Sequence, residues 1–371
     1  MCLSVTLPVA RHLIYILPYL VLMIFFKEKS IRIGDEGKPF ILIIASGLLF
    51  FLWSNKEGFK DIYFIITGIS ISFLIDIPRV NTSIIAIVLT ICMFVNFVFC
   101  GNIKNGFEFD LLRSVSTFEG SFSYMFGIIG LLSIIERKFI LYSFCLFLTV
   151  LSLKRIAIAA LIIGSFFVFL GEKRARVVLN PVIMVAVNLA ILLTIVLYGT
   201  GTFDFLINNL AGISSNQFTQ GRRLLLSLPS AEIYMNFDSF LLFGKGPGSA
   251  YVLANKSFNL IGTDQRLHSD ILKIVYEYGA VIFCFFIWLM YSAKSYLTRI
   301  AFLYMNILFI SDNTLIYSFY LVLFSCCVRR ISLVHPADTC LIQHPTSINI
   351  FDEGHRFSAF RNRDPKNFKS A

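Results

Sequence analysis

Residues 139–171, FILYSFCLFLTVLSLKRIAIAALIIGSFFVFLG, show the pattern from which the fold class can be predicted. Lys154 and Arg155 are its only charged residues, and they separate two apolar runs of roughly 15 residues each. A helix of that length rises roughly 22 Å, less than the roughly 30 Å hydrocarbon core of a bilayer. The pattern predicts two membrane helices joined by a cationic turn that is recessed below the outer headgroups.

The composition of the whole chain agrees with a lipid environment. Of the 371 residues, 57% are hydrophobic and only 15% are charged, and 40 are phenylalanine. So few charged residues cannot cover a water-soluble core that contains so much apolar surface, which excludes a soluble globular enzyme. The sequence predicts an all-α, polytopic integral membrane protein.

Apolar runs long enough to approach a bilayer crossing recur along the chain and predict about eleven transmembrane helices, within a range of about 10 to 12. The runs are 12–26, 40–53, 62–77, 84–100, 122–135, 139–152, 156–171, 177–198, 274–292, 300–310 and 314–328. The net charge of +10 comes from basic residues in the gaps between these runs, so it reflects topology and not a nucleic-acid site. The eight cysteines are interpreted as small hydrophobic residues.

The basic gaps also predict the orientation, because Lys and Arg are enriched on the cytoplasmic side. Such gaps include KEKSIRIGDEGK (27–38) and EKRAR (172–176). Four regions follow: an N-terminal transmembrane bundle (1–198), a large outer loop carrying the site (199–270), C-terminal transmembrane helices (271–330), and a polar tail (331–371) that is expected to be disordered and cytoplasmic.

Lys154 and Arg155 are a candidate site for an anion, since two recessed cations are costly without a partner. The alternative is an ordinary topogenic loop or a snorkelling pair. From this turn the chain crosses the membrane twice before it reaches the long loop, so the cation pair and the loop are expected on the same face.

Two basic motifs lie within the long loop. Arg222 and Arg223 of GRR carry guanidinium groups that suit pyrophosphate oxygens, although a solvated basic turn has the same composition. In GKGPG, the glycines Gly244, Gly246 and Gly248 would allow backbone amides to approach an anion, and Lys245 would add a charge. The alternative for GKGPG is a plain turn.

His268 is the candidate general base. It precedes Ser269 and Asp270, which are suitable N-cap residues, so its imidazole is expected at a helix N-terminus near the outer surface. A lone histidine is more often a polar cap. Lys273 and Glu277 are one turn apart and are expected to support the site as an ion pair.

The sequence offers no convincing metal site. Glu108 and Asp110 form a carboxylate pair in the outer loop 101–121, but no histidine or third carboxylate adjoins them. We therefore expect neither a metal nor another cofactor.

These motifs together resemble the O-antigen polymerase and O-antigen ligase superfamily of bacterial envelope glycosyltransferases. The resemblance lies in the number of crossings, the late outer loop, SLKR (152–155), GRR (221–223), GKGPG (244–248) and the segment HSDILKIVYEYG (268–279). It implies transfer of a glycan from undecaprenyl pyrophosphate to a sugar hydroxyl at the periplasmic face of the inner membrane, without a nucleotide sugar or metal.

The resemblance also implies roles for the residues. Lys154, Arg155, Arg222 and Arg223 would bind the pyrophosphate, and His268 would deprotonate the attacking hydroxyl. The preferred function is a polymerase, whose acceptor is a lipid-linked repeat unit. A chain-length regulator in the membrane would be a partner, and nucleic acid would not. The alternatives are an O-antigen ligase that uses lipid A core as acceptor, and a flippase or exporter of lipid-linked oligosaccharides.

Overall fold

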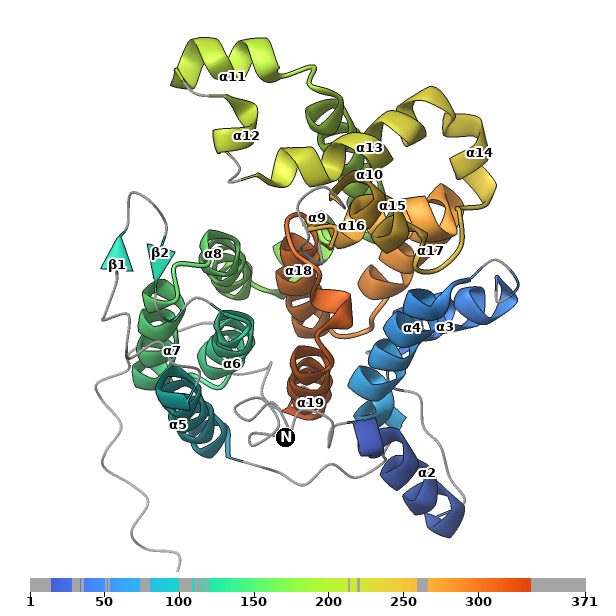
Figure 1. Ribbon diagram of the computed structural model, residues 1–371. Coiled ribbons are helices and arrows are strands. Elements are labelled where there is room, and N and C mark those ends of the chain that lie inside the picture. The colour runs from blue at the N-terminus through green and yellow to red at the C-terminus, as the bar shows by residue number, and fades with distance from the viewer. Residues whose placement is uncertain are drawn as a thin grey trace, which may run out of the picture. The chain divides into compact units, whose positions relative to one another are not determined.

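The computed structural model describes residues 15–28, 34, 37–50, 52, 54–73, 81–99, 109–110, 115–116, 118, 120–212, 214–218, 221–258 and 266–334 (Figure 1). These residues are almost entirely helical, which confirms the all-α prediction. The strands of the described chain are a two-residue antiparallel pair, β1 (Phe109–Asp110) and β2 (Val115–Ser116).

The helices follow the apolar runs. They are α2 (Leu17–Glu28), α3 (Lys38–Leu49), α4 (Lys56–Ile69), α5 (Thr82–Phe99), α6 (Phe122–Ile135), α7 (Phe139–Leu151), α8 (Arg155–Leu170), α9 (Glu172–Val178), α10 (Pro181–Thr200), α11 (Asp204–Ala211), α12 (Ser215–Phe218), α13 (Arg222–Met235), α14 (Phe237–Leu242), α15 (Ser249–Phe258), α16 (Asp270–Tyr278), α17 (Ala280–Tyr291), α18 (Tyr296–Phe309) and α19 (Ser318–Val334), with short 3₁₀ turns at Ser70–Phe73 and Thr314–Ile316.

Two predicted boundaries are wrong. The run 274–292 is not one helix: the chain breaks at Gly279, whose φ of 95° and ψ of 162° are accessible only to glycine, so α16 and α17 are separate. The final helix continues through the basic pair Arg329–Arg330 to Val334, because the apolar periodicity persists past the charges. The rest of the predicted tail, 335–371, lies outside the described residues.

The core is formed by α6, α16 and α18 within a compact unit that ends at Leu333. Every residue of α6 from Phe122 to Ile134 is buried, as is the whole of α16. Helix α6 approaches α18 closely at Gly127, where a Cβ atom would lie 2.0 Å from Tyr304 Oη. The Tyr304 hydroxyl donates a hydrogen bond to the Tyr124 carbonyl at 2.9 Å, so the two helices are joined at this point.

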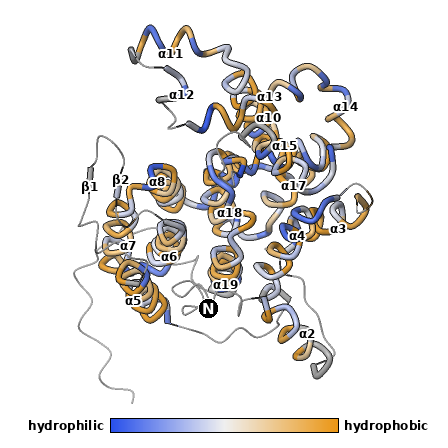
Figure 2. Tube along the Cα trace, viewed as in Figure 1, coloured by the Kyte–Doolittle hydropathy of each residue, from blue (hydrophilic) through white to orange (hydrophobic). Residues whose placement is uncertain are grey.

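The outer helices present apolar side chains outward. Large hydrophobic residues are more than half exposed on α5, α7, α8, α10 and α17, and examples are Ile91, Ile140, Phe166, Leu193 and Phe285. Figure 2 shows α5, α7 and α8 as mainly hydrophobic along their length. One described helix, Pro181–Thr200, is both long and apolar enough to cross a membrane by itself, and shorter apolar helices lie at seven other places in the described chain.

The long loop of the prediction folds as short helices, α11 to α15. Helix α13 packs along α10, and the two helices meet where a Cβ atom on Gly199 would lie 2.2 Å from Ser230 Oγ. In Figure 1 these short helices gather at one end of α10 and α17, at the top of the view. Helices α13, α14 and α15 pack against the bundle, so the loop does not form a separate unit among the described residues.

Candidate functional site

The candidate site is centred on Asp312, in the connector between α18 and α19. Asp312 is only 2% exposed. Its Oδ1 accepts hydrogen bonds from the Asn313 amide at 2.8 Å and from the Tyr317 hydroxyl at 3.3 Å, and its Oδ2 accepts one from the Tyr124 hydroxyl. The carboxylate is thereby held in one orientation by three donors from two parts of the chain.

Three segments that the sequence analysis singled out meet at this connector. Lys154 Nζ lies 3.9 Å from Asp312 Oδ2, and His268 Nδ1 lies 3.9 Å from Asp312 Oδ1. Arg222 Nη1 donates a hydrogen bond to the carbonyl of the preceding residue, Ser311, at 3.1 Å. The structure therefore brings Lys154, Arg222 and His268 together, although 114 residues separate the first from the last.

The local fold explains how His268 is presented. The side chain of Ser269 caps α16 by accepting a hydrogen bond from the Leu272 amide at 3.3 Å, as the sequence predicted for this helix start. The Asp270 amide donates to the Asp312 carbonyl at 3.2 Å, which fixes this turn beside the connector. The His268 side chain is 33% exposed, but its Nδ1 is buried without a hydrogen-bond partner among the described residues. The ring therefore turns Nδ1 toward Asp312 and leaves its other edge accessible.

The surrounding groups keep Asp312 ionised. Burial alone would raise the pKa of this carboxyl, but its interactions with His268, the Tyr124 hydroxyl, the Lys154 charge and the Asn313 amide together lower the pKa to about 2. A permanent negative charge beside Nδ1 favours the proton on that nitrogen and leaves Nε2 free to accept one. The 3.9 Å separation is an ion-pair distance, and an approach of about 1 Å would form a hydrogen bond.

The two cations of the SLKR turn have different environments. Leu153 has a positive φ of 51°, and this turn ends α7 and starts α8 at Arg155. Lys154 points toward Asp312 and is 18% exposed in its side chain. Arg155 is exposed and forms no ion pair or hydrogen bond with any described residue. Lys154 therefore has the partner that a recessed cation needs, whereas the Arg155 guanidinium is accessible to a ligand.

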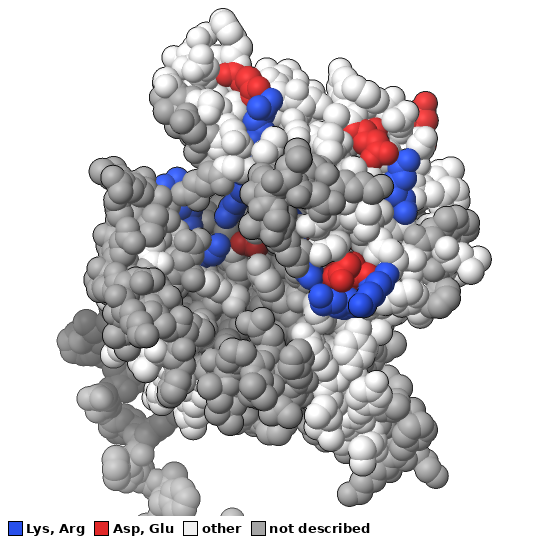
Figure 3. All heavy atoms as spheres, in the orientation of Figure 1, with Lys and Arg blue, Asp and Glu red and all other residues white. Residues whose placement is uncertain are grey.

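Two other predicted basic residues are paired elsewhere. Arg223 Nη2 lies 2.5 Å from Asp204 Oδ2 at the start of α11. Lys245 Nζ lies 3.4 Å from Glu232 Oε1 and 5.5 Å from the centre of the Phe240 ring. Figure 3 shows charged atoms on this face in several separate groups, most of which contain both signs. Arg223 and Lys245 are not brought to Asp312.

The GKGPG glycines are explained by close packing. A Cβ atom on Gly244 would lie 2.2 Å from the backbone carbon of Glu277, and one on Gly248 would lie 2.2 Å from Asn55 Oδ1. The amides of Lys245 and Gly246 donate to the carbonyls of Tyr276 and Glu277 at 2.8 and 3.0 Å. The motif therefore connects the end of α16 to the start of α4.

Lys273 and Glu277 form no direct ion pair with each other, although the two charges interact as the prediction expected. Lys273 forms its ion pair with Asp61 on α4, while the Glu277 carboxylate accepts a hydrogen bond from the Ala250 amide at 3.3 Å. Asp270 accepts hydrogen bonds from the Thr314 hydroxyl at 3.1 Å and the Leu315 amide at 3.0 Å. The supporting residues are thus buried and have partners that are distant in sequence, because tertiary contacts compete with the neighbouring turn. Asp270 Oδ1 is buried without a hydrogen-bond partner among the described residues.

Sequence reasoning missed Asp312, Tyr124 and Tyr317. The available signal was the polar triplet Ser311-Asp312-Asn313 between the apolar runs 300–310 and 314–328, which has the composition of any short turn. Of the weak carboxylate pair, Glu108 lies outside the described residues.

Comparison of the chain with protein-family models, with curated proteins and with solved structures finds no match.

Proposed function

We propose that this chain is a polytopic membrane glycosyltransferase, an O-antigen polymerase. It would transfer a glycan from undecaprenyl pyrophosphate onto a lipid-linked repeat unit at the outer face of the bacterial inner membrane. The observation that supports this most directly is the gathering of Lys154, Arg222 and His268 around Ser311 and Asp312. Cations beside a histidine whose Nδ1 faces a buried carboxylate are the groups that such a transfer needs.

A membrane location is supported by the outward-facing surface of the helices. Residues such as Ile140 (90% exposed), Phe169 (68%) and Phe166 (59%) would be costly to leave in water over so many neighbouring helices. Lipid acyl chains would solvate them. The remaining charges then lie at the ends of the helices or in buried pairs, as a bilayer requires.

The proposed reaction is a single displacement. The hydroxyl oxygen of the acceptor sugar attacks the anomeric carbon of the donor, the bond from that carbon to the pyrophosphate oxygen breaks, and the hydroxyl proton passes to His268 Nε2. Undecaprenyl pyrophosphate leaves, with its developing negative charge neutralised by Arg155, Arg222 and Lys154. The anomeric configuration is inverted because attack occurs opposite the leaving group.

The proposal is tested by deleting the gene in its host and restoring it as wild type, His268→Ala or the control His344→Ala, which changes a histidine of the polar tail. For a polymerase, deletion removes the polysaccharide ladder from a gel and leaves a single-repeat band. Wild type and His344→Ala restore the ladder, and His268→Ala does not, although equal amounts of protein are found in the membrane fraction.

The alternatives give different gels. A ligase is indicated if deletion removes every repeat from lipid A core while lipid-linked polymer accumulates. An unchanged ladder would contradict both enzymes. If the protein is a flippase or exporter, deletion of its gene would leave lipid-linked repeats on the cytoplasmic side of the membrane. The His268→Ala variant would then still restore transport.

A further inference from the structure

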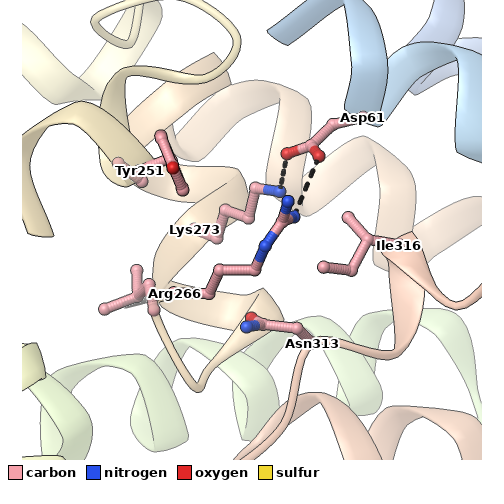
Figure 4. A pocket seen from close by; sticks show the side chains of 8 residues that line it. Asp61, Tyr251, Arg266, Lys273, Asn313 and Ile316 are labelled. Atoms are coloured by element: carbon pink, nitrogen blue, oxygen red, sulfur yellow. Dashed lines mark hydrogen bonds and ion pairs between the residues drawn. The ribbon is translucent and has the colours of Figure 1, made fainter. Parts of the chain in front are cut away.

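Two cations on either side of His268 bind one carboxylate of another helix. Arg266 Nη1 lies 3.4 Å from Asp61 Oδ1, and the Lys273 ammonium pairs with Asp61 Oδ2. Figure 4 shows both side chains reaching Asp61 from the same stretch of chain. Arg266 is two residues before His268 and Lys273 is five residues after it, so the stretch that carries the histidine is fixed to α4 at both ends.

Asp61 and Lys273 are the most buried residues of this cluster. The side chains of Asp61 and Lys273 are 6% and 11% exposed, so each needs the other to remain charged. Arg266 is less buried, at 27%, and has two further contacts: Glu57 Oε2 at 3.6 Å and the Tyr251 ring, whose centre is 5.4 Å from Cζ. Asp61 is therefore the common partner, and Glu57 is a secondary, more exposed contact.

The same cluster adjoins the candidate site. A small pocket is lined by Asp61, Arg266, Lys273 and Asn313, among others (Figure 4). Asn313 follows Asp312 directly and donates its amide to that carboxylate at 2.8 Å. The pocket is thus lined on one side by the connector that contains Asp312, and on another side by the stretch 266–273, which contains His268.

We propose that Asp61 is a positioning residue: through Arg266 and Lys273 it fixes the chain on both sides of His268 and so holds the imidazole against Asp312. This inference rests on the proposed function, because it assigns Asp61 a role in presenting the base. Asp61 touches neither substrate nor the reacting atoms in this proposal. Its effect on the reaction passes through the 3.9 Å contact between His268 and Asp312.

The test measures the position of the His268 ring directly, from the chemical shifts of its ring nitrogens by NMR of the histidine-labelled full chain in lipid nanodiscs, with the resonance identified from His268→Ala. Asp312, Lys154 and Arg222 are present in every variant compared. Arg266→Gln removes the first tether and retains the buried pair of Asp61 and Lys273, so this variant is expected to fold. Asp61→Asn removes both tethers, and Glu57→Gln is the matched control.

If Asp61 positions the histidine, the His268 ring moves away from the Asp312 carboxylate, so its ring nitrogen chemical shifts change in Arg266→Gln and change further in Asp61→Asn, but not in Glu57→Gln. In the same order, kcat falls roughly 10-fold or more with little change in KM. Unchanged His268 chemical shifts in folded Arg266→Gln would overturn the inference. Loss of the tethering effect is distinct from failure of the proposed function, which the gel with His268→Ala decides independently of this measurement.

Discussion

At the scale of single residues, the site depends on a carboxylate that is surrounded by positive and hydrogen-bonding groups. Asp312 contacts Lys154 and His268 at the same distance, 3.9 Å, on its two different oxygens. It therefore lies between the Lys154 ammonium and the His268 imidazole and faces both. The lysine and the histidine are thus preorganised, and binding does not have to order them.

The first prediction concerns this charge. Asp312→Asn keeps the shape of the side chain but removes the negative charge that orients His268, so the rate of polymer formation is expected to fall at least about 10²-fold. The measurement is the turnover of purified protein in nanodiscs with a lipid-linked repeat unit. Asp238→Asn, on the exposed surface of α14, is the control and should retain full activity. Full activity in Asp312→Asn would contradict the proposed role.

The second prediction concerns pH and Asp270. Burial raises the pKa of Asp270 to about 7, against the opposing effects of Lys273 and of hydrogen bonds from Leu315 and Thr314. The unfolded chain loses this proton near pH 4, so the folded state binds more protons between pH 4 and 7 and loses stability as the pH rises through that range. Thermal unfolding in detergent measures the effect. Asp270→Asn should remove this part of the pH dependence, and an unaltered profile would contradict the assignment.

At the scale of elements, the important feature is the break between α16 and α17. The chain is apolar after Gly279, whereas α16 before it is a short buried helix that carries Asp270, Lys273 and Glu277. A continuous helix would carry these charged side chains in a different direction. The break also brings the backbone next to the end of α14, where Leu242 lies.

The third prediction compares two glycines. Gly279 (φ 95°, ψ 162°) and Gly171 (φ 82°, ψ 162°) have nearly the same backbone conformation, which costs a non-glycine residue about 1–3 kcal/mol. A Cβ atom on Gly279 would additionally lie 2.9 Å from the Leu242 carbonyl oxygen, whereas Gly171 has open space around it. Gly279→Ala should therefore lower the unfolding temperature more than Gly171→Ala does. Equal losses would show that backbone strain alone is responsible.

At the scale of the whole molecule, the candidate site and the short helices α11 to α15 occupy one end of the bundle. Lys154, Arg222, His268 and Asp312 come from four separate parts of the chain, and all are joined to that end. A second cluster, in which the Glu136 carboxylate pairs with Lys138 and Arg330, joins α6 to α19. Exposed apolar side chains cover the outer helices α5, α7, α8, α10 and α17.

The fourth prediction is the topology that follows. In a chain whose native cysteines are replaced by serine, Asp238→Cys and Arg155→Cys should react with a membrane-impermeant maleimide added to intact spheroplasts. Lys173→Cys, exposed on α9, should react only after the membrane is opened. Labelling of residues 173 and 238 from the same side would contradict the crossing pattern, and labelling of 155 and 238 from opposite sides would contradict a shared site.

The helices themselves could be predicted from the sequence because their cause is local. Each apolar run between basic gaps produced a helix, including α6, α7, α8 and α10, and Ser269 capped α16 as its position indicated. The break at Gly279 could not be predicted with the same ease, since an apolar run with one glycine is also typical of a continuous helix.

The apolar runs and the basic motifs were thus enough to predict the helices and to select Lys154, Arg222 and His268 as candidate residues. Their partners depend on how the helices pack. Asp312 lies 44 residues after His268, and Asp61 lies 212 residues before Lys273. Such pairs depend on which helices pack together and at what height, and burial then requires each charge to find a partner of opposite sign. The spacing of residues along one helix carries no information about that choice.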